Sequence, residues 1–366
     1  MEYVESDLVK IAKRENNKKR SYLVVDPLQG KHVPVVPSKA LELFTSLADT
    51  IRNEYSNESL LLVGFAQTAT AIGAQMAVSI GARYIHTTRE TIPDVEYMFF
   101  SEEHSHATEQ KLVKDDIDSV TDQIDRIVFV EDEVTTGNTI LNIIKILDRE
   151  YSGKFKYSVA SLLNGMGAKH LEIYDRKNIC LHYLVKTDHG TYGDLNDEFA
   201  GNGNYYNCFN KIDFDYPTIS ISNRVDTRRI VSAEEYREAC EYLWQEIEKE
   251  IDDFTQENTL VIGTEEFMFP ALFVAYKLEE KGNSVLCHST TRSPITVSLE
   301  DEYPLHSRYE IKSVYDSERR TFIYDIAEYD RVFIITDSPK TETEGIKTLV
   351  NALKTYNENI TVIRWC

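Results

Sequence analysis

Fragments of the first half of this chain recur, in the same order, in the second half. The apolar run LLLVGF at residues 60–65 is matched by TLVIGT at residues 259–264, and each follows a stretch with helical patterning. Further on, RYIHTTRE is matched by VLCHSTTRSP, and DRIVFVEDEVTTG by DRVFIITDSPKTE. The spacing of a shared glycine, arginine and aspartate also agrees: Gly64, Arg89 and Asp132 in the first half, and Gly263, Arg292 and Asp337 in the second. Repetition in a fixed order and spacing predicts two copies of one fold.

Each copy has the pattern of a strand, a turn and a helix. In the first copy, QTATAIGAQMAVSIGA follows the glycine-ended run and places small and apolar residues at helical spacing. Residues 83–87 and 127–130 predict two more strands, and residues 138–148 predict a helix after the second of these. Strands that alternate with helices form a mostly parallel sheet, which binds ligands at the carboxyl ends of its strands. We therefore expect an α/β fold of two Rossmann-like, parallel-sheet domains, of which the second is a degenerate copy.

Length and composition favour a globular protein of two domains. A chain of 366 residues is too long for one ordinary core. Its net charge of −21 argues against a surface for nucleic acid or membrane, and its one short basic run, at residues 13–20, is expected in a solvated extension. Five scattered cysteines without a CxxC spacing predict neither disulfides nor a zinc site and favour the cytoplasm. No apolar stretch predicts export or a membrane span.

The predicted organisation has four parts. These are an extension at residues 1–21, a first domain at 22–187, an irregular segment at 188–222 and a second domain at 223–366. The irregular segment is rich in Gly, Asn, Asp and Tyr and has no sustained period. Because long ordered loops are often functional, we expect this segment to be a lid or a linker.

Acids and hydroxyls are concentrated at residues 127–139, IVFVEDEVTTGNT. A glycine-containing turn of hydroxylated residues between a strand and a helix presents backbone N–H groups at the positive end of the helix, which is a phosphate site. Glu131 and Asp132 would repel a phosphate, but they can accept hydrogen bonds from neutral sugar hydroxyls. The segment therefore predicts a site for a sugar 5-phosphate, and a strand followed by a solvated acidic turn is the alternative. Glu133 has no assigned role and is expected to face solvent.

The apolar strand, paired acids and T-T-G-x-T in register resemble the phosphoribosyl pyrophosphate (PRPP) motif of the type I phosphoribosyltransferases. GKHVPVVPS, VGFAQTATAIG, SEEHSHAT, GTEEFMFP and STTRSPI extend the likeness from about residue 22 to the end of the chain. Together these stretches are similar to the bacterial phosphoribosyltransferases joined to a C-terminal TRSP domain, which accompany tellurite-resistance-type gene clusters. The resemblance implies a transferase in the first domain, a type I fold in both, and a role in the biosynthesis of a nucleoside-like metabolite.

The resemblance assigns roles to positions in the first domain. The acid pair that holds the ribose hydroxyls corresponds to Glu131 and Asp132. The residues implied in binding the 5-phosphate are Thr135, Thr136, Gly137, Asn138 and Thr139, and those implied in binding pyrophosphate are Ala66, Gln67, Thr68 and Ala69. Arg89 is expected to meet the same leaving group. Mg²⁺ is expected to be held mainly by PRPP, with Asp132 as a candidate protein ligand, and to neutralise the leaving charge.

A lid is expected over this site. In type I enzymes the loop between the second and third strands closes over the substrate, and here that loop contains SEEHSHAT. His104 and His106 are therefore candidates to donate to pyrophosphate or to act as general acid or base, because imidazole titrates near neutrality. A pair of merely solvated histidines is the alternative.

The second domain has a degraded form of the site. Glu265 and Glu266 stand where the first copy has an alanine and a glutamine, so pyrophosphate binding is not expected there. Thr291, Arg292 and Ser293 of the TRSP signature could anchor an anion, or they could stabilise the interface between the two halves.

The leading hypothesis is an enzyme that transfers the 5-phosphoribosyl group from PRPP to an unidentified small-molecule acceptor and releases pyrophosphate. Thr135 stands where purine-salvage members of the type I class carry an aspartate, which makes a purine acceptor less expected. The alternatives are a non-catalytic protein that senses PRPP or a nucleotide, and a PRPP synthetase-like enzyme, although no ATP-binding segment is recognisable. A homodimer is a possible assembly.

Overall fold

The structure is a computed structural model that describes residues 2–15, 20–100, 110–193, 199–209, 214–251 and 257–366. The chain divides into two compact units. The first consists of Met1–Glu5, Leu41–Asp188 and Val225–Glu238, and the second of Ser6–Ala40, His189–Arg224 and Ala239–Cys366. Residues 22–40 thus belong to the second unit, whereas the predicted first domain, residues 22–187, includes them. The predicted domain boundaries stay a prediction.

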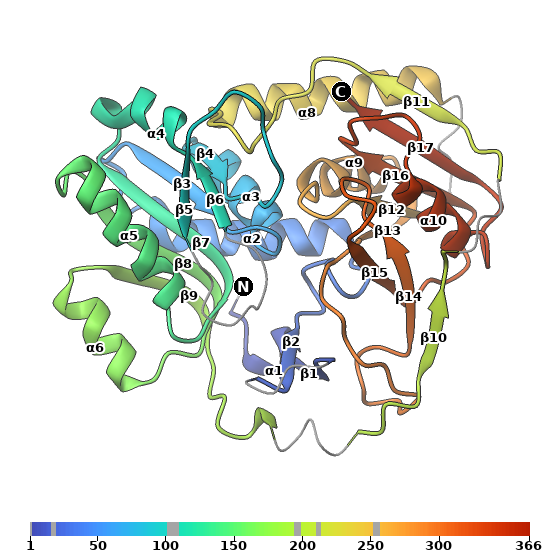
Figure 1. Cartoon of the computed structure of the whole chain (residues 1–366), viewed down its shortest axis with the longest axis horizontal. Coiled ribbons are helices and arrows are strands. Elements are labelled where there is room, and N and C mark those ends of the chain that lie inside the picture. The colour runs from blue at the N-terminus through green and yellow to red at the C-terminus, as the bar shows by residue number, and fades with distance from the viewer. Residues whose placement is uncertain (1, 16–19, 101–109, 194–198, 210–213, 252–256) are drawn as a thin grey trace. The chain divides into compact units, whose positions relative to one another are not determined.

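A five-stranded, all-parallel sheet in the order β4-β3-β7-β8-β9 forms the first unit (Figure 1). Its strands are β3 (Leu60–Gly64), β4 (Arg83–His86), β7 (Arg126–Val134), β8 (Lys156–Asn164) and β9 (Cys180–Lys186). The first five residues of β7 are all buried, as are the last eight of β8. Unbroken buried runs of this kind occur where both faces of a sheet are covered, so the fold is the predicted α/β class.

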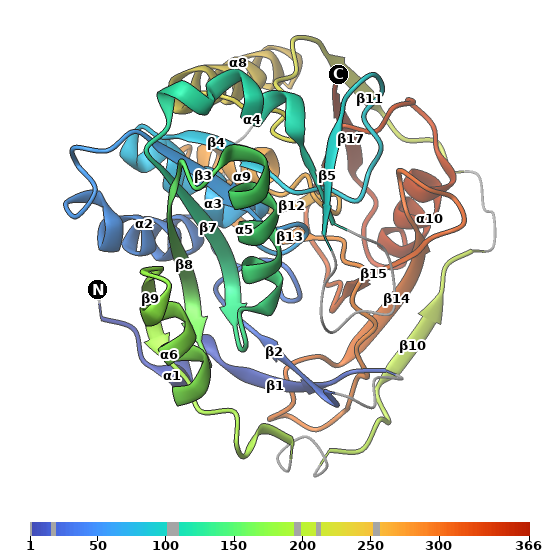
Figure 2. The same cartoon turned by 60° about the vertical axis from the view of Figure 1, so that its left-hand side comes forward.

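Helices and a small antiparallel pair complete this unit. The helices are α3 (Thr70–Ile80), α4 (Lys114–Val120), α5 (Asn138–Tyr151) and α6 (Ala168–Arg176), with the 3-10 turn η1 (Thr121–Gln123); α2 (Pro37–Arg52) enters from the second unit. The antiparallel pair is β5 (Tyr97–Phe100) with β6 (Gln110–Val113). Ile140, Ile144 and Leu147 of α5 join one apolar cluster with Val63 and Phe129 of the sheet, and Figure 2 shows α5 beside β7.

The second unit contains another five-stranded parallel sheet, in the order β11-β17-β16-β12-β13. Its strands are β11 (Thr218–Ile221), β12 (Asn258–Gly263), β13 (Ser284–Ser289), β16 (Arg331–Thr336) and β17 (Ile360–Trp365). Its helices are α9 (Phe269–Glu280) and α10 (Glu344–Leu353), and α8 (Ala233–Glu250) enters from the first unit. The second unit also contains a three-stranded sheet in the order β10 (Asn204–Asn207), β14 (Ser307–Lys312) and β15 (Arg320–Tyr324).

Corresponding strands of the two large sheets have the same order and register. In the first unit Gly64 of β3 pairs with His86 of β4 and Val130 of β7. In the second unit Gly263 of β12 pairs with Ser289 of β13 and Ile335 of β16. An antiparallel pair, β5-β6 or β14-β15, precedes the third strand in both. The units differ at the fifth place, which β9 fills from the end of the first copy and β11 from before the start of the second.

The segment that leads into the first helix of each copy belongs to the unit built by the other copy. Val35, just before α2, pairs with Cys287 of β13 in the second unit. Val231, just before α8, pairs with Tyr84 of β4 in the first unit. Because Tyr84 and Cys287 occupy the same register position, the exchange is reciprocal. The duplication therefore extends to the way each copy begins.

Three of the described strands lie where irregular or solvated chain was predicted. β10 and β11 fall inside the segment 188–222, which was predicted to be irregular. β1 (Lys10–Lys13) lies in the predicted solvated extension and pairs with β2 (Tyr22–Val25). A four-residue helix, α1 (Glu5–Leu8), precedes them. The pattern missed β10 because all four of its residues are exposed, so it carries no apolar alternation. Within the described part of the chain no helix has the length and apolarity needed to cross a membrane.

Glu58 is expected to make the stability of the first unit depend on acid pH. Its carboxylate accepts hydrogen bonds from Arg126 and Lys156, and chiefly the Arg126 bond lowers the pKa of Glu58 from 4.5 to about 2. A lowered carboxyl pKa contributes stability that is present above pH 4.5 and is lost as the pH falls toward 2. The unfolding free energy of wild type should therefore fall between neutral and acid pH. In Glu58→Gln, which lacks this carboxyl group, we expect that fall to be smaller by about 1–2 kcal/mol.

Urea unfolding at about pH 7 and pH 3 measures this difference. Asp49→Asn is the control, because the Asp49 side chain is 59% exposed in its pair with Arg52 and such pairs contribute little. Equal pH dependence of wild type and Glu58→Gln would contradict the prediction.

Candidate functional site

The carboxyl ends of β3 and β7 meet at one edge of the first sheet. Gly64 stands opposite Val130, and the Phe65 N–H donates to the Val130 carbonyl at 3.1 Å. The loop that begins at Ala66 therefore leaves the sheet beside β7, in which the acids begin at Glu131. This is the edge at which parallel α/β sheets bind ligands.

Side chains from neighbouring strands hold the loop after β3. The Ala66 N–H donates to Thr87 Oγ1 at 2.8 Å, and Gln110 Nε2 donates to the Ala66 carbonyl at 2.6 Å. Thr87 in turn donates to Gln110 Oε1 at 2.7 Å. The loop folds back closely on its own strand, since a Cβ on Gly64 would lie 2.9 Å from the Ala69 carbonyl oxygen. Ala66, Gln67, Thr68 and Ala69 thus form a fixed turn, and the Ala66–Gln67 peptide bond is cis.

The turn after β7 begins α5 with a glycine. Gly137 has a φ of +70° and is the N-cap of the helix, so the N-cap position brings no side chain to the helix end. Tyr174 of α6 donates to the Gly137 carbonyl at 2.7 Å, and a Cβ on Gly137 would lie 2.2 Å from the Tyr174 hydroxyl. The Asn138 N–H donates to Thr136 Oγ1 at 3.3 Å. A 14-residue helix concentrates positive potential at this end.

The acid pair occupies the last part of β7. Glu131 pairs in register with Ser161 of β8, and both Glu131 and Asp132 are partly buried. Burial, and secondarily the Glu131 carboxylate, raise the pKa of Tyr174 above its ordinary value. Glu131 is therefore near the residue that supports Gly137. Glu133 is also partly buried rather than fully exposed.

The residues after β4 continue toward the same edge. The Thr87 N–H donates to the Gly64 carbonyl at 2.9 Å, and Thr88 exchanges backbone hydrogen bonds of 2.8 and 3.0 Å with Lys111 of β6. These bonds fix the backbone immediately before Arg89 beside the end of β3. His104 and His106 lie outside the described residues. Among the described residues, no group of three or more His, Cys, Asp or Glu is placed to hold a metal ion.

The second unit brings its predicted candidates together. Arg292 Nε lies 2.7 Å from Glu265 Oε2, and Arg292 Nη2 lies 3.5 Å from Glu266 Oε1. Thr291 exchanges backbone hydrogen bonds with Phe322 of β15, and Ser293 donates its N–H to Thr291 Oγ1 at 3.3 Å. The TRSP signature thus contacts the GTEEF loop inside its own unit.

Sequence reasoning missed the residues that support the two turns. Thr87 and its counterpart Thr290 recur in the duplicated HTTR and HSTTR stretches, so the repeat itself carried that signal. Gln110 and Tyr174 have no such signal, because their role depends on which backbone groups they reach across the fold.

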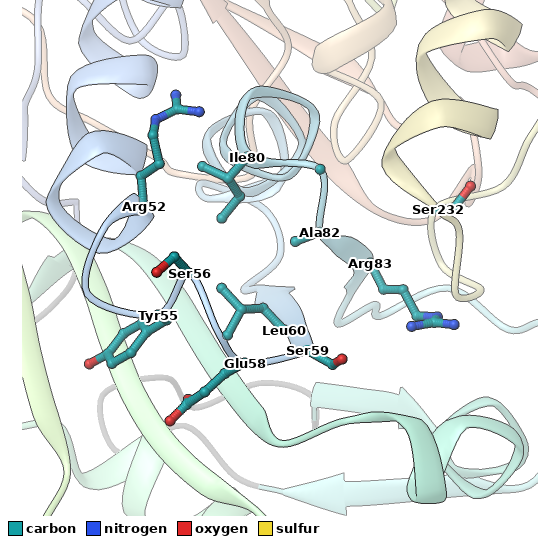
Figure 3. Close-up of a pocket in the computed structure, with 11 residues that line it drawn as sticks. Arg52, Tyr55, Ser56, Glu58, Ser59, Leu60, Ile80, Ala82, Arg83 and Ser232 are labelled. Carbon is teal, nitrogen blue, oxygen red and sulfur yellow. The ribbon is translucent and has the colours of Figure 1, made fainter.

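A separate pocket of about 350 Å³ lies at the amino ends of the strands of the same sheet (Figure 3). Leu60 and Arg83, which begin β3 and β4, line it together with Ile80 at the end of α3. Because this pocket is at the amino ends of the strands, it is distinct from the candidate site.

Two protein families match this chain, one in each half of the sequence. Residues 8–187 match a family described as "Phosphoribosyl transferase", and residues 227–353 match one described as a TRSP domain C-terminal to it. The chain belongs to the TRSP-containing phosphoribosyltransferases. The order of the two matches confirms the predicted fusion of a phosphoribosyltransferase with a C-terminal TRSP domain. No curated protein is a significant match.

Solved structures similar to this phosphoribosyltransferase come from several organisms. The adenine phosphoribosyltransferase of Rhodothermus marinus is 13% identical, with 50% of this chain and 96% of that chain covered and a TM-score of 0.34. The Trypanosoma brucei adenine phosphoribosyltransferase, in complex with AMP, pyrophosphate and ribose-5-phosphate, is 16% identical, with 49% and 76% covered and a TM-score of 0.35. The orotate phosphoribosyltransferase of Aeropyrum pernix is 19% identical, with 50% and 86% covered and a TM-score of 0.30.

Gly137→Ala is expected to destabilise this phosphoribosyltransferase far more than Gly153→Ala. Both glycines have a φ near +70°, but a Cβ on Gly153 would meet nothing within 4 Å, whereas one on Gly137 would overlap Tyr174 and Met166. The left-handed backbone costs each alanine about 1–2 kcal/mol, and overlap in a packed interior adds about 1–3 kcal/mol for Gly137→Ala alone. Urea unfolding of the two variants isolates the overlap, and equal losses would show that Tyr174 does not pack against the turn.

Proposed function

We propose that this chain transfers the 5-phosphoribosyl group from PRPP to a small-molecule acceptor and releases pyrophosphate. The observation that carries the proposal is the arrangement at the carboxyl ends of these strands: an acid pair ends β7, a glycine turn follows it, and the fixed loop after β3 begins beside β7. The family match to a phosphoribosyl transferase supports the reaction class.

In this proposal the 5-phosphate of PRPP binds at the start of α5. Gly137 lets the backbone turn tightly, and the first-turn N–H groups of the helix point toward the anion. The hydroxyls of Thr135, Thr136 and Thr139 and the Asn138 amide supply neutral hydrogen-bond donors. No acid of the turn itself opposes a phosphate, because Glu131 and Asp132 precede it on the strand.

Glu131 and Asp132 bind the ribose. Their carboxylates accept hydrogen bonds from the 2- and 3-hydroxyls, and they stabilise the positive charge that develops on the ribose ring as pyrophosphate leaves C1. Transfer through such a cationic state needs charge stabilisation more than it needs a covalent nucleophile.

Pyrophosphate leaves toward the loop after β3 and Arg89. Ala66, Gln67, Thr68 and Ala69 contain no carboxylate, so nothing in the loop repels the anion. Thr87 and Gln110 already fix the Ala66 backbone, and a turn fixed before the ligand arrives costs less to organise in the transition state.

The carboxylates at this edge fit a magnesium ion that arrives with PRPP. Hard oxygen ligands suit Mg²⁺, which is commonly held by one or two carboxylates together with substrate phosphates. Asp132 is the proposed protein ligand, and Mg²⁺ when bound supplies charge neutralisation for the leaving group.

The acceptor is proposed to be a compound that is nucleophilic without help from Thr135, in the biosynthesis of a nucleoside-like metabolite. His104 and His106 stay predictions for the lid, as do the homodimer and the cytoplasmic location.

Pyrophosphate release tests the proposed activity. The full chain is incubated with PRPP, Mg²⁺ and a panel of heterocyclic and amine acceptors, and PRPP binding is measured in parallel as a rise in melting temperature. Release that depends on one acceptor class supports the proposal. Tight PRPP binding without release across a broad panel would favour the sensor, and ribose 5-phosphate with ATP tests the synthetase.

Asp132→Asn is expected to lower turnover by about 10²-fold or more while leaving the fold intact, because an amide stabilises developing positive charge poorly. Glu133→Gln, the same kind of change one residue along the strand, is the control and is expected to keep turnover within about 3-fold of wild type. Turnover that falls equally in both variants, or in neither, would show that the acid pair is misassigned.

A further inference from the structure

Glu265 of the second unit is buried in a cage of cations and donors. Its side chain is 1% exposed, and Oε2 lies 2.7 Å from Arg292 Nε and 3.3 Å from Arg319 Nη2. Ser313 donates its hydroxyl to Oε1. A carboxylate held by two guanidinium groups and a hydroxyl is bound as an anionic ligand would be bound.

The loop that carries Glu265 has the same support as the loop after β3 in the first unit. The Glu265 N–H donates to Thr290 Oγ1 at 3.0 Å, as the Ala66 N–H does to Thr87 Oγ1 at 2.8 Å. By strand register Glu265 corresponds to Ala66, and Arg292 follows its strand as Arg89 does in the first copy. The Glu265 carboxylate therefore fills a volume that an alanine side chain cannot fill.

In the second unit, side chains and backbone of the same chain also cover Asp337 and the start of α10, which correspond to Asp132 and the start of α5 in the first unit. Residues 313–319 connect β14 to β15, and Tyr315 donates to Asp337, the counterpart of Asp132. Arg224 Nη1 lies 3.2 Å from Asp337 Oδ2. At the start of α10, a Cβ on Gly345 would lie 2.3 Å from the Ser313 carbonyl oxygen, so the connection packs against that helix end.

Charge in this enclosure is balanced within the chain. Glu265, Glu266 and Asp337 face Arg292, Arg319 and Arg224 at distances of 2.7–3.5 Å. Burying these charges is costly unless each is paired, so loss of one carboxylate leaves an arginine excess that an outside anion can satisfy.

We propose that the second unit contains a latent polyphosphate site in which the Glu265 carboxylate takes the place of a phosphate group. The TRSP signature supplies its arginine, Arg292, and the connection between β14 and β15 supplies Arg319 and Ser313. That the corresponding loop of the first unit binds pyrophosphate rests on the proposed function, whereas the contacts around Glu265 do not depend on it. The wild-type second unit accordingly binds no pyrophosphate.

Titration with inorganic pyrophosphate tests the latent site. Glu265→Ala in the full chain is expected to bind one more pyrophosphate per chain than wild type, by isothermal titration calorimetry. Arg292→Met added to Glu265→Ala is expected to abolish that extra site. Glu257→Ala is the matched control, because it removes the carboxylate beside Arg331 at the other end of the same sheet and is expected to add no site.

Stability provides a second measurement if Glu265→Ala folds poorly. Pyrophosphate is expected to raise the melting temperature of Glu265→Ala by more than it raises that of wild type, and Glu265→Gln is expected to show a smaller excess in the same direction. Equal stoichiometry and equal melting shifts for wild type and Glu265→Ala would overturn the proposal, as would a wild-type protein that already binds pyrophosphate in a manner abolished by Arg292→Met. Failure of the proposed transfer would instead appear as a wild type that binds neither PRPP nor pyrophosphate, with the gain in Glu265→Ala unchanged.

Discussion

Parallel pairing of the first strand of each copy with its third is the constraint on which the rest of the structure depends. Gly64 opposite Val130, and Gly263 opposite Ile335, bring the loop after one strand next to the acidic residues at the carboxyl end of the other. Glycine is required at the strand end because the following loop folds back to within van der Waals reach of it. Once this register is set, a threonine from the neighbouring strand can fix the loop backbone, and it does so in both units.

The two units share this scaffold but differ in the charge of the loop after the first strand. The first unit has a loop without carboxylates and a glycine-capped helix, so a bound anion can complete its hydrogen bonds. In the second unit Glu265 supplies the anion, and Thr343 caps α10 by accepting the Ile346 N–H at 3.1 Å. Desolvation offsets most of the attraction between a buried carboxylate and arginine held this way, so the pair adds little net stability.

The segments before α2 and α8 are exchanged between the two copies, so each unit needs residues from both copies to be complete. Val35, from the first copy, pairs with the edge strand β13 of the second unit, and Val231, from the second copy, pairs with the edge strand β4 of the first unit. These edges would otherwise expose unpaired backbone groups, which are open to pairing with other chains. Neither compact unit therefore corresponds to one uninterrupted stretch of sequence, which is why boundaries drawn from the repeat differ from those of the units.

The sequence by itself determined the α/β class, the two copies and the acid-rich turn, since each depends on local periodicity or on residues that are neighbours in the chain. It also marked Glu265 and Arg292 as a departure from the first copy, although it left open whether they anchor a ligand or hold structure together. Tertiary structure alone decided that these two residues pair with each other, that Tyr174 supports Gly137, and that residues 22–40 belong with the second unit. Each of these depends on which distant side chains reach one another across a sheet, and chain-local patterns carry no information about that distance.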